Sequence, residues 1–99
     1  MKAPEIASAA SELVGGDRAE AYGDIYDGWN KTAAMWNAIL LAAGKPPCLD
    51  AHIAATMMEG LKMVRRFNGP FRADNYIDAC GYAGCAGEIA ARDAQGTMR

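Results

Sequence analysis

The stretch "RADNYIDACGYAGC", residues 72–85, holds the residues that decide how the helices of this protein pack. It carries two aspartates, Asp74 and Asp78, and then runs almost entirely into small residues. Four-residue spacing places the two carboxylates on one face of a helix. We therefore expect a helix that presents acid at its start and a very small surface to its neighbours.

Three glycines in and just after this stretch, Gly81, Gly84 and Gly87, recur at three-residue steps. Each lowers helix propensity by about 1 kcal/mol relative to alanine, and we expect close approach of a second helix to offset that cost. The wider composition points the same way, because 21 residues are alanine and only 13 are isoleucine, leucine or valine. Such shallow apolar faces favour an oligomer, in which a partner surface buries what one chain cannot.

Prolines and glycines divide the chain into helical segments. A first helix begins near Pro4 and ends at Gly15 and Gly16, and capping-box-like spacing predicts a short helix from Asp17. The next helix begins at Ile25, and its positions Trp29, Thr32, Trp36, Ile39 and Leu40 share one face. Gly44 and the two prolines that follow Lys45 end it.

Two more helices follow in the second half of the chain. Asp50 is the expected N-cap of a helix that ends at residues 68–70, "NGP". Asp74 is the expected cap of the last helix, which runs to about Ala94, with residues 95–99 as a frayed tail. Strand signals are missing. Residues 1–99 are thus predicted to form a single all-α domain, a compact bundle of four main helices. The apolar side of the helix that Asp50 caps carries Ile53, Met57, Gly60, Leu61 and Val64.

Charge and composition exclude several classes of partner. A net charge of -2 gives no field that draws a protein to DNA or to anionic membranes. The longest apolar run, residues 38–43, is far shorter than the roughly 20 residues of a membrane span. Three cysteines without a repeated spacing and a lone histidine, His52, predict neither disulfides nor a zinc site. We expect a cytoplasmic protein.

A basic cluster in "MMEGLKMVRR" is the first candidate site. Lys62 and Arg66 are four residues apart on one helical face, and Arg65 lies beside them. Arginine forks and a lysine point charge suit phosphate oxygens. If this helix is antiparallel to the last one, Lys62 or Arg66 can meet Asp78, and a structural ion pair between two helices is then the simpler interpretation. Three cations near two acids still leave a surplus positive charge, which favours an anionic ligand, with Asp74, Asn75 and Asp78 beside it.

The segment "GDRAEAYGD", residues 16–24, is the second candidate. A glycine breaks the helix where Arg18 and Tyr22 are gathered, which suits a binding loop, and a capped helix corner explains the segment equally well. For Trp29, a place in the core and a place on a surface that stacks against a base are about equally expected, whereas Trp36 is expected in the core.

Taken together, "GDRAEAYGD", the tryptophan of "AAMWNAIL", "MMEGLKMVRR" and "DNYIDACGYAG" resemble a family of small phage and prophage proteins of unassigned function. The resemblance covers residues 16–84. That family is in turn distantly similar to the MazG-like all-α nucleotide pyrophosphohydrolases. The helices of those enzymes present an ExxE motif and, further on, an ExxD motif to magnesium and a triphosphate. The resemblance implies a MazG-like helical fold and a nucleotide ligand.

The departures from the MazG-like pattern decide between functions. No ExxE motif occurs, Lys62 follows Glu59 where a second acid is wanted, and the ExxD-like spacing has an acid only at Asp78. Magnesium sites for phosphoanhydride cleavage need several convergent carboxylates. We therefore predict no catalytic residue, no metal site and no cofactor, and expect a homo-oligomer that sequesters a linear or cyclic nucleotide, such as a host immune signal, without cleaving it. The ligand-binding residues would be Arg18, Tyr22, Lys62, Arg65, Arg66, Asp74, Asn75 and Asp78.

Two alternatives stay open. In the first, the protein is a magnesium-dependent nucleoside triphosphate pyrophosphohydrolase that uses Glu20, Asp24, Glu59, Asp74 and Asp78. In the second, it is a protein-protein adaptor in which these residues are all structural.

Overall fold

The computed structural model describes residues 1–16 and 23–97, and the regular structure in them is entirely helical. The helices are α1 (Ala3–Gly15), α3 (Ile25–Ala42), α4 (Ala51–Arg65) and α5 (Asp74–Thr97). The predicted all-α class with four main helices is confirmed. The short helix expected from Asp17 lies outside the described residues. None of the helices in the described ranges is long and apolar enough to cross a membrane.

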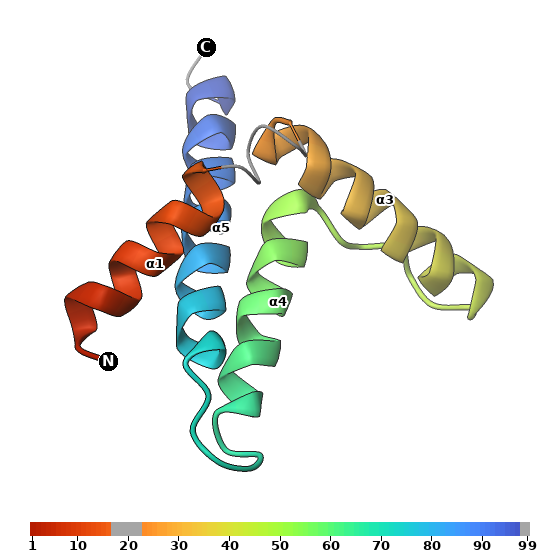
Figure 1. Ribbon diagram of the computed structural model, residues 1–99. Coiled ribbons are helices and arrows are strands. Elements are labelled where there is room, and N and C mark those ends of the chain that lie inside the picture. The colour runs from red at the N-terminus through yellow and green to blue at the C-terminus, as the bar shows by residue number, and fades with distance from the viewer. Residues whose placement is uncertain (17–22, 98–99) are drawn as a thin grey trace.

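Helices α4 and α5 lie side by side as an antiparallel hairpin, and the other two helices are placed on it (Figure 1). Helix α1 crosses α5. Helix α3 starts close to the upper part of this hairpin and then runs away from it, so that it projects as an arm before the chain returns to α4 (Figure 1). The hairpin is therefore the body of the fold, and α3 is its least enclosed helix.

The helix starts and stops follow the local chemistry of the sequence. An Asp50 carboxylate oxygen accepts a hydrogen bond from the Ile53 amide at 2.8 Å, so the predicted N-cap is confirmed. Asp24 caps α3 in the same way through the Asp27 amide at 3.3 Å. Gly44, which follows α3, has φ +74°, a conformation that glycine adopts without strain, and the predicted stop is confirmed there.

Three predicted boundaries are wrong by a few residues. Helix α4 ends at Arg65, before the "NGP" turn, because the hydrogen bonds of residues 66–68 tighten to three-residue steps. Asp74 is the first residue of α5 rather than its cap, although a carboxylate there still favours the helix N-terminus. At the other end α5 continues past Ala94 to Thr97, since no proline follows to stop it.

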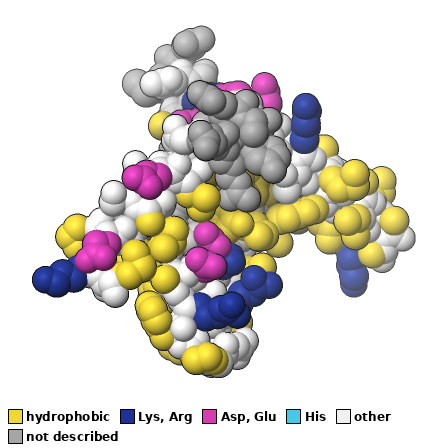
Figure 2. Space-filling view, in the orientation of Figure 1, with side chains coloured by type: hydrophobic (Ala, Val, Ile, Leu, Met, Phe, Trp, Pro, Cys, Tyr) yellow, Lys and Arg dark blue, Asp and Glu magenta, His cyan; other side chains and the backbone are white. Residues whose placement is uncertain are grey.

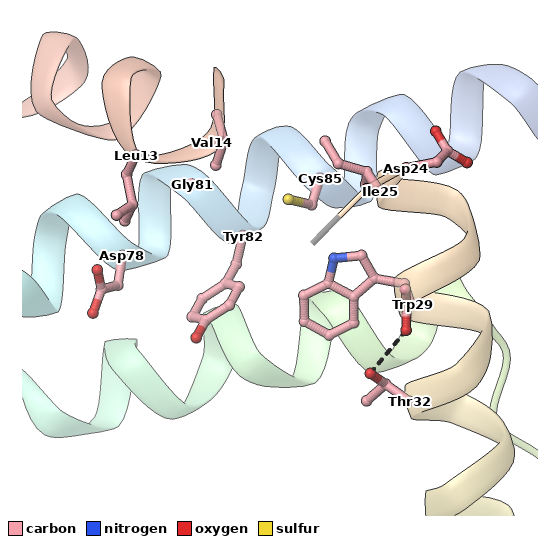
Figure 3. A pocket seen from close by; sticks show the side chains of 12 residues that line it. Leu13, Val14, Asp24, Ile25, Trp29, Thr32, Asp78, Gly81, Tyr82 and Cys85 are labelled. Carbon is pink, nitrogen blue, oxygen red and sulfur yellow. Dashed lines mark hydrogen bonds between the residues drawn. The ribbon is translucent and has the colours of Figure 1, made fainter. Parts of the chain in front are cut away.

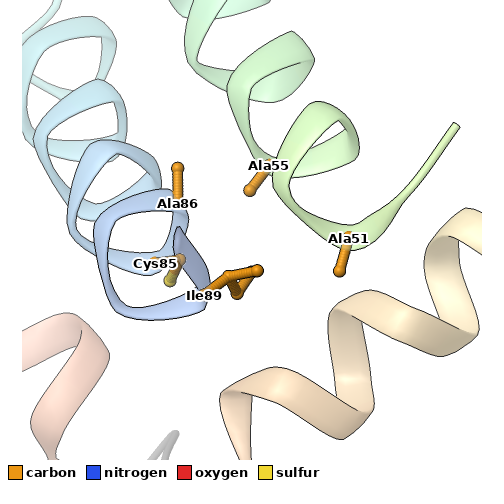
Figure 4. Packing of buried hydrophobic residues seen from close by; sticks show 5 residues of the cluster. All are labelled: Ala51, Ala55, Cys85, Ala86 and Ile89. Carbon is orange, nitrogen blue, oxygen red and sulfur yellow. The ribbon is translucent and has the colours of Figure 1, made fainter. Parts of the chain in front are cut away.

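The core lies between α4, α5 and the start of α3, and it consists mainly of small side chains (Figure 4). Ile89 is the largest fully buried side chain in the described part of the chain, at 1% exposure. Around it lie buried Ala51, Ala55, Cys85 and Ala86, with Val14, Ile25, Tyr26 and Trp29 partly buried against this cluster. The predicted thin core is thus confirmed. Small side chains bring α4 and α5 close together but bury little apolar area.

The glycines of α5 serve close packing at one position rather than three. A Cβ added at Gly81 would lie 3.3 Å from Cγ1 of Val14, so this glycine lets α1 approach α5. A Cβ at Gly84 or Gly87 would meet no atom of the described residues within 4 Å. The expected close contact at Gly84 and Gly87 is therefore wrong within the chain, because α1 crosses α5 at one point instead of running along it.

The apolar side of α4 is turned away from α5. The face that packs on α5 carries Ala51, Ala54 and Ala55, all nearly inaccessible to solvent. Ile53, Met57, Leu61 and Val64 remain between 39% and 60% exposed on the other side. The short side chains allow the closer helix approach, so they occupy the contact and the larger side chains stay outside.

Candidate functional site

A pocket of about 520 Å³ opens where α1, the start of α3 and the middle of α5 meet (Figure 3). Its size is within the range of small-molecule sites. Leu13 and Val14 of α1 form one wall. The other lining residues are Gly23, Asp24, Ile25, Gly28, Trp29 and Thr32 at the start of α3, and Asp78, Gly81, Tyr82 and Cys85 of α5. The pocket exists because Gly81 lets α1 cross α5 at close range while α3 leaves at an angle.

Two aromatic rings line the pocket. The Trp29 and Tyr82 rings meet edge to face, with centroids 5.9 Å apart and an interplanar angle of 82°. Beside them the Thr32 hydroxyl donates to the Gly28 carbonyl at 3.0 Å. Trp29, for which core and stacking were equally favoured, is half-buried: it packs against the core cluster and also lines the pocket. Its stacking on a ligand stays a prediction.

Asp78 connects the pocket to the basic cluster. Asp78 lines the pocket, and one of its carboxylate oxygens lies 2.9 Å from Nζ of Lys62, with side-chain exposures of 26% for Asp78 and 14% for Lys62. The ion pair that the sequence spacing allows between the two helices is therefore present. It pins α4 to α5 and fixes the lysine head next to the pocket.

The other members of the basic cluster are held at the end where α4 and α5 join. Asn75 is buried and donates from Nδ2 to the Arg65 carbonyl at 3.2 Å, which fixes the backbone there. The Arg66 guanidinium carbon lies 4.5 Å from the centre of the Tyr76 ring, a cation-π contact, while its buried Nε has no hydrogen-bond partner among the described residues. The Arg65 side chain is exposed. Figure 2 shows lysine and arginine side chains gathered near this lower end of the molecule.

Most of the predicted ligand-binding residues therefore lie together. Lys62, Arg65, Arg66, Asp74, Asn75 and Asp78 come from the adjoining ends of α4 and α5. The Asn75 side chain donates to the backbone carbonyl of Arg65, and Asp74 is exposed with no ion pair in the described ranges. Arg18 and Tyr22 lie outside the described residues.

A second charged network joins the start of α3 to the end of α5, and sequence reasoning missed it. Arg92 donates to both Asp24 oxygens, at 2.9 and 2.7 Å, and lies 3.6 Å from a Glu88 oxygen. The Tyr26 hydroxyl donates to Asp93 at 3.0 Å. Asp24 and Arg92 are 68 residues apart, so no local spacing in the sequence indicates that they form a pair. This network holds α3, and with it Trp29, against α5.

These contacts shift the proton affinities of the groups. The hydrogen bonds from Arg92 are the largest cause that lowers the pKa of Asp24 below its ordinary 3.8. The same partnership raises the pKa of Arg92, and the bond to the Asp93 carboxylate raises the pKa of Tyr26. In the pocket wall, burial raises the pKa of the Cys85 thiol, which keeps it protonated and unreactive.

We predict that an Arg92→Gln variant loses stability at neutral pH and that its deficit fades in acid. Because the folded pKa of Asp24 is depressed, the pair stabilises the fold above the unfolded pKa and is lost as pH falls through the folded value. The free energy of unfolding, measured with urea from about pH 7 to about pH 2, checks this expectation. Glu88→Gln, which keeps the bidentate pair, should show a smaller deficit. A deficit for Arg92→Gln that is the same at every pH would show that the Asp24 charge is not involved.

The acids of the hydrolase alternative are dispersed. Asp24 is bound to Arg92 and Asp78 to Lys62, and Figure 3 shows these two at opposite ends of the pocket. Within residues 1–16 and 23–97, no three histidine, cysteine, aspartate or glutamate side chains are grouped so that they could hold a metal ion. Glu20, the remaining member of the first acidic pair, lies outside these ranges.

Comparison with known proteins places the chain among sequences without an assigned activity. A family model described as a domain of unknown function (DUF6378) matches residues 5–90. The Gene 55 protein of Mycobacterium phage L5 is 32% identical over 79 residues, an alignment that covers 80% of this chain and 48% of the phage protein. The chain thus spans about half the length of that relative. No solved structure matches the chain.

Proposed function

This chain belongs to the DUF6378 family, which confirms the predicted resemblance to a phage family of unassigned function, and we propose that it binds a nucleotide without cleaving it. The ligand is a linear or cyclic nucleotide, and the role is to sequester it in the cytoplasm. A nucleotide immune signal of a phage-infected host is a ligand of this class.

The position of Asp78 is the observation that carries the proposal. Asp78 lines an aromatic pocket of nucleotide size, and its carboxylate holds Lys62 Nζ at 2.9 Å. One residue therefore joins a surface for a base to a surface for phosphate. Asp78 neutralises the charge of Lys62 in this pair, so the surplus positive charge that favours an anionic ligand comes from Arg65 and Arg66 of the same cluster.

The two parts of the site suit the two parts of a nucleotide. Trp29 and Tyr82 offer aromatic faces, and stacking of a base on such a ring is worth about 1–3 kcal/mol. Phosphate oxygens then lie toward Lys62, with the exposed Arg65 at the last position of the same helix and the half-buried Arg66 directly after it.

Dispersion of the acids supports binding over hydrolysis. In-line cleavage of a phosphoanhydride is accelerated by metal ions that neutralise the developing charge, and those ions need convergent oxygen ligands. Asp24 and Asp78 instead form ion pairs with cationic side chains of the protein, Arg92 and Lys62 respectively. The competing function, a magnesium-dependent pyrophosphohydrolase with MazG-like chemistry, is tested by the same experiment.

The experiment is to incubate the purified protein with a panel of linear and cyclic nucleotides and magnesium, remove unbound ligand, heat the protein and chromatograph what is released. Recovery of an intact nucleotide only after heating is the expected result. Release of monophosphate and pyrophosphate before heating would establish the hydrolase. If no nucleotide is retained and none is altered, both the binding and the hydrolase functions are wrong, and the adaptor interpretation remains.

We predict that Lys62→Ala weakens nucleotide binding by roughly 10- to 100-fold, the loss of one charge-assisted hydrogen bond. Asp78→Asn is the matched control, since it breaks the same ion pair but keeps the lysine charge. Both variants should lose similar thermal stability, and Asp78→Asn should bind far better than Lys62→Ala. Titration by calorimetry gives the affinities. Equal affinities of the two variants would mean that Lys62 has only a structural role.

A further inference from the structure

Large apolar side chains form an exposed stripe along α4. Ile53, Met57, Leu61 and Val64 follow one another at steps of four, four and three residues, so they share one face of the helix. Their exposed fractions are 39%, 49%, 39% and 60%. The alanine surface packed on α5 lies about 120° around the same helix. The larger apolar face of α4 thus has no cover within the described part of the chain.

The projecting helix α3 continues this pattern. Met35 and Ile39, one turn apart, are 63% and 60% exposed. Figure 2 shows hydrophobic side chains gathered over the α3 arm and running back toward the body of the molecule. Single exposed apolar residues are ordinary on proteins, but four large apolar side chains in register on one helix face form an extended apolar surface of the kind that marks an interface.

The chain exposes more surface than a compact monomer of its mass. A compact monomer of 10.5 kDa exposes roughly 5,400 Å², whereas this chain exposes 6824 Å², an excess of about 1,400 Å². Its radius of gyration is 14.9 Å, where roughly 13 Å is usual for 100 residues. If two chains bury this excess against each other, the interface covers about 2,800 Å² in total, within the range of obligate homodimers.

We propose that a second copy of this chain covers the α4 stripe and the Met35–Ile39 side of α3, and that the protein is a two-fold homodimer. A two-fold axis needs only a surface that complements itself, and an uncharged stripe of aliphatic and methionine side chains meets that need without pairing like charges. The small net charge of -2 opposes association weakly. The proposed interface lies on α3 and α4, not on the glycine face of α5.

Methionine oxidation of the native protein tests the assigned face. Met57 and Met63 are on the same helix and are similarly exposed, at 49% and 46%, but they are rotated by about 120° from each other. Brief hydroxyl-radical exposure followed by mass spectrometry should oxidise Met63 several times faster than Met57 and Met35. Light scattering of the same sample should give twice the 10.5 kDa chain mass. A monomer at micromolar concentration, or a dimer in which Met57 reacts as fast as Met63, would overturn the proposal.

Matched variants extend the test. Met57→Glu places a charge inside the proposed interface and should weaken dimerisation by at least about 100-fold, whereas Met63→Glu should leave it unchanged. If Met57→Glu fails to fold, the oxidation pattern of the native dimer still decides. The nucleotide assay above is independent of these measurements, because its pocket is built from α1, α3 and α5 of one chain. A dimer that binds no nucleotide would contradict the proposed function but not the dimer. A monomer that binds a nucleotide would contradict the dimer but not the proposed function.

Discussion

Ile89→Ala is expected to lower the free energy of unfolding by about 2–5 kcal/mol, a large part of the roughly 5–15 kcal/mol that stabilises a typical domain. Ile89 is 1% exposed and is the largest fully buried side chain in residues 1–16 and 23–97. The buried side chains around it are alanines and one cysteine, which are too short to fill the cavity that the substitution leaves; the larger neighbours are only partly buried against the cluster.

Urea unfolding followed by circular dichroism at one fixed protein concentration measures this effect. Leu41→Ala is the matched control, because it removes an aliphatic side chain that is 66% exposed near the end of α3. It should change stability by less than about 0.5 kcal/mol. Similar losses for the two variants would show that the core is not centred on Ile89.

Ala55→Leu is expected to destabilise the protein by about 1–3 kcal/mol or more, although leucine is the more hydrophobic residue. Ala55 is 0% exposed in the contact between α4 and α5, and the two helices would have to separate to admit a larger side chain. Separation would also lengthen the bond between Lys62 and Asp78, which spans the same contact.

Ala90→Leu, on the exposed side of α5, tests whether the loss comes from packing or from helix propensity. Both substitutions replace alanine by leucine within a helix, so their intrinsic propensity costs are alike and small. Thermal unfolding by circular dichroism at equal concentrations compares them. If Ala55→Leu is as stable as Ala90→Leu, the close approach of α4 and α5 is not required by the fold.

Part of the candidate site can be predicted from the local spacing of residues in the sequence. Lys62 and Arg66 on one helix face and Asp74 and Asp78 on another predict a contact once two helices form a hairpin, and the Lys62–Asp78 pair is that contact. The pocket walls are not readable in this way. Tyr82 meets Trp29 across more than fifty residues, and Arg92 reaches Asp24 over 68, so their partnership depends on where α3 leaves the hairpin.

The sequence by itself determined the helices and their ends, because caps such as Asp50 and stops such as Gly44 act within a few residues of chain. It also determined that the core would be thin, since composition limits the apolar area that can be buried. Tertiary structure decided which side of α4 faces inward. Periodicity identifies an apolar face but not its partner, and here the alanine face permits the closer approach to α5, so the stripe from Ile53 to Val64 stays outside.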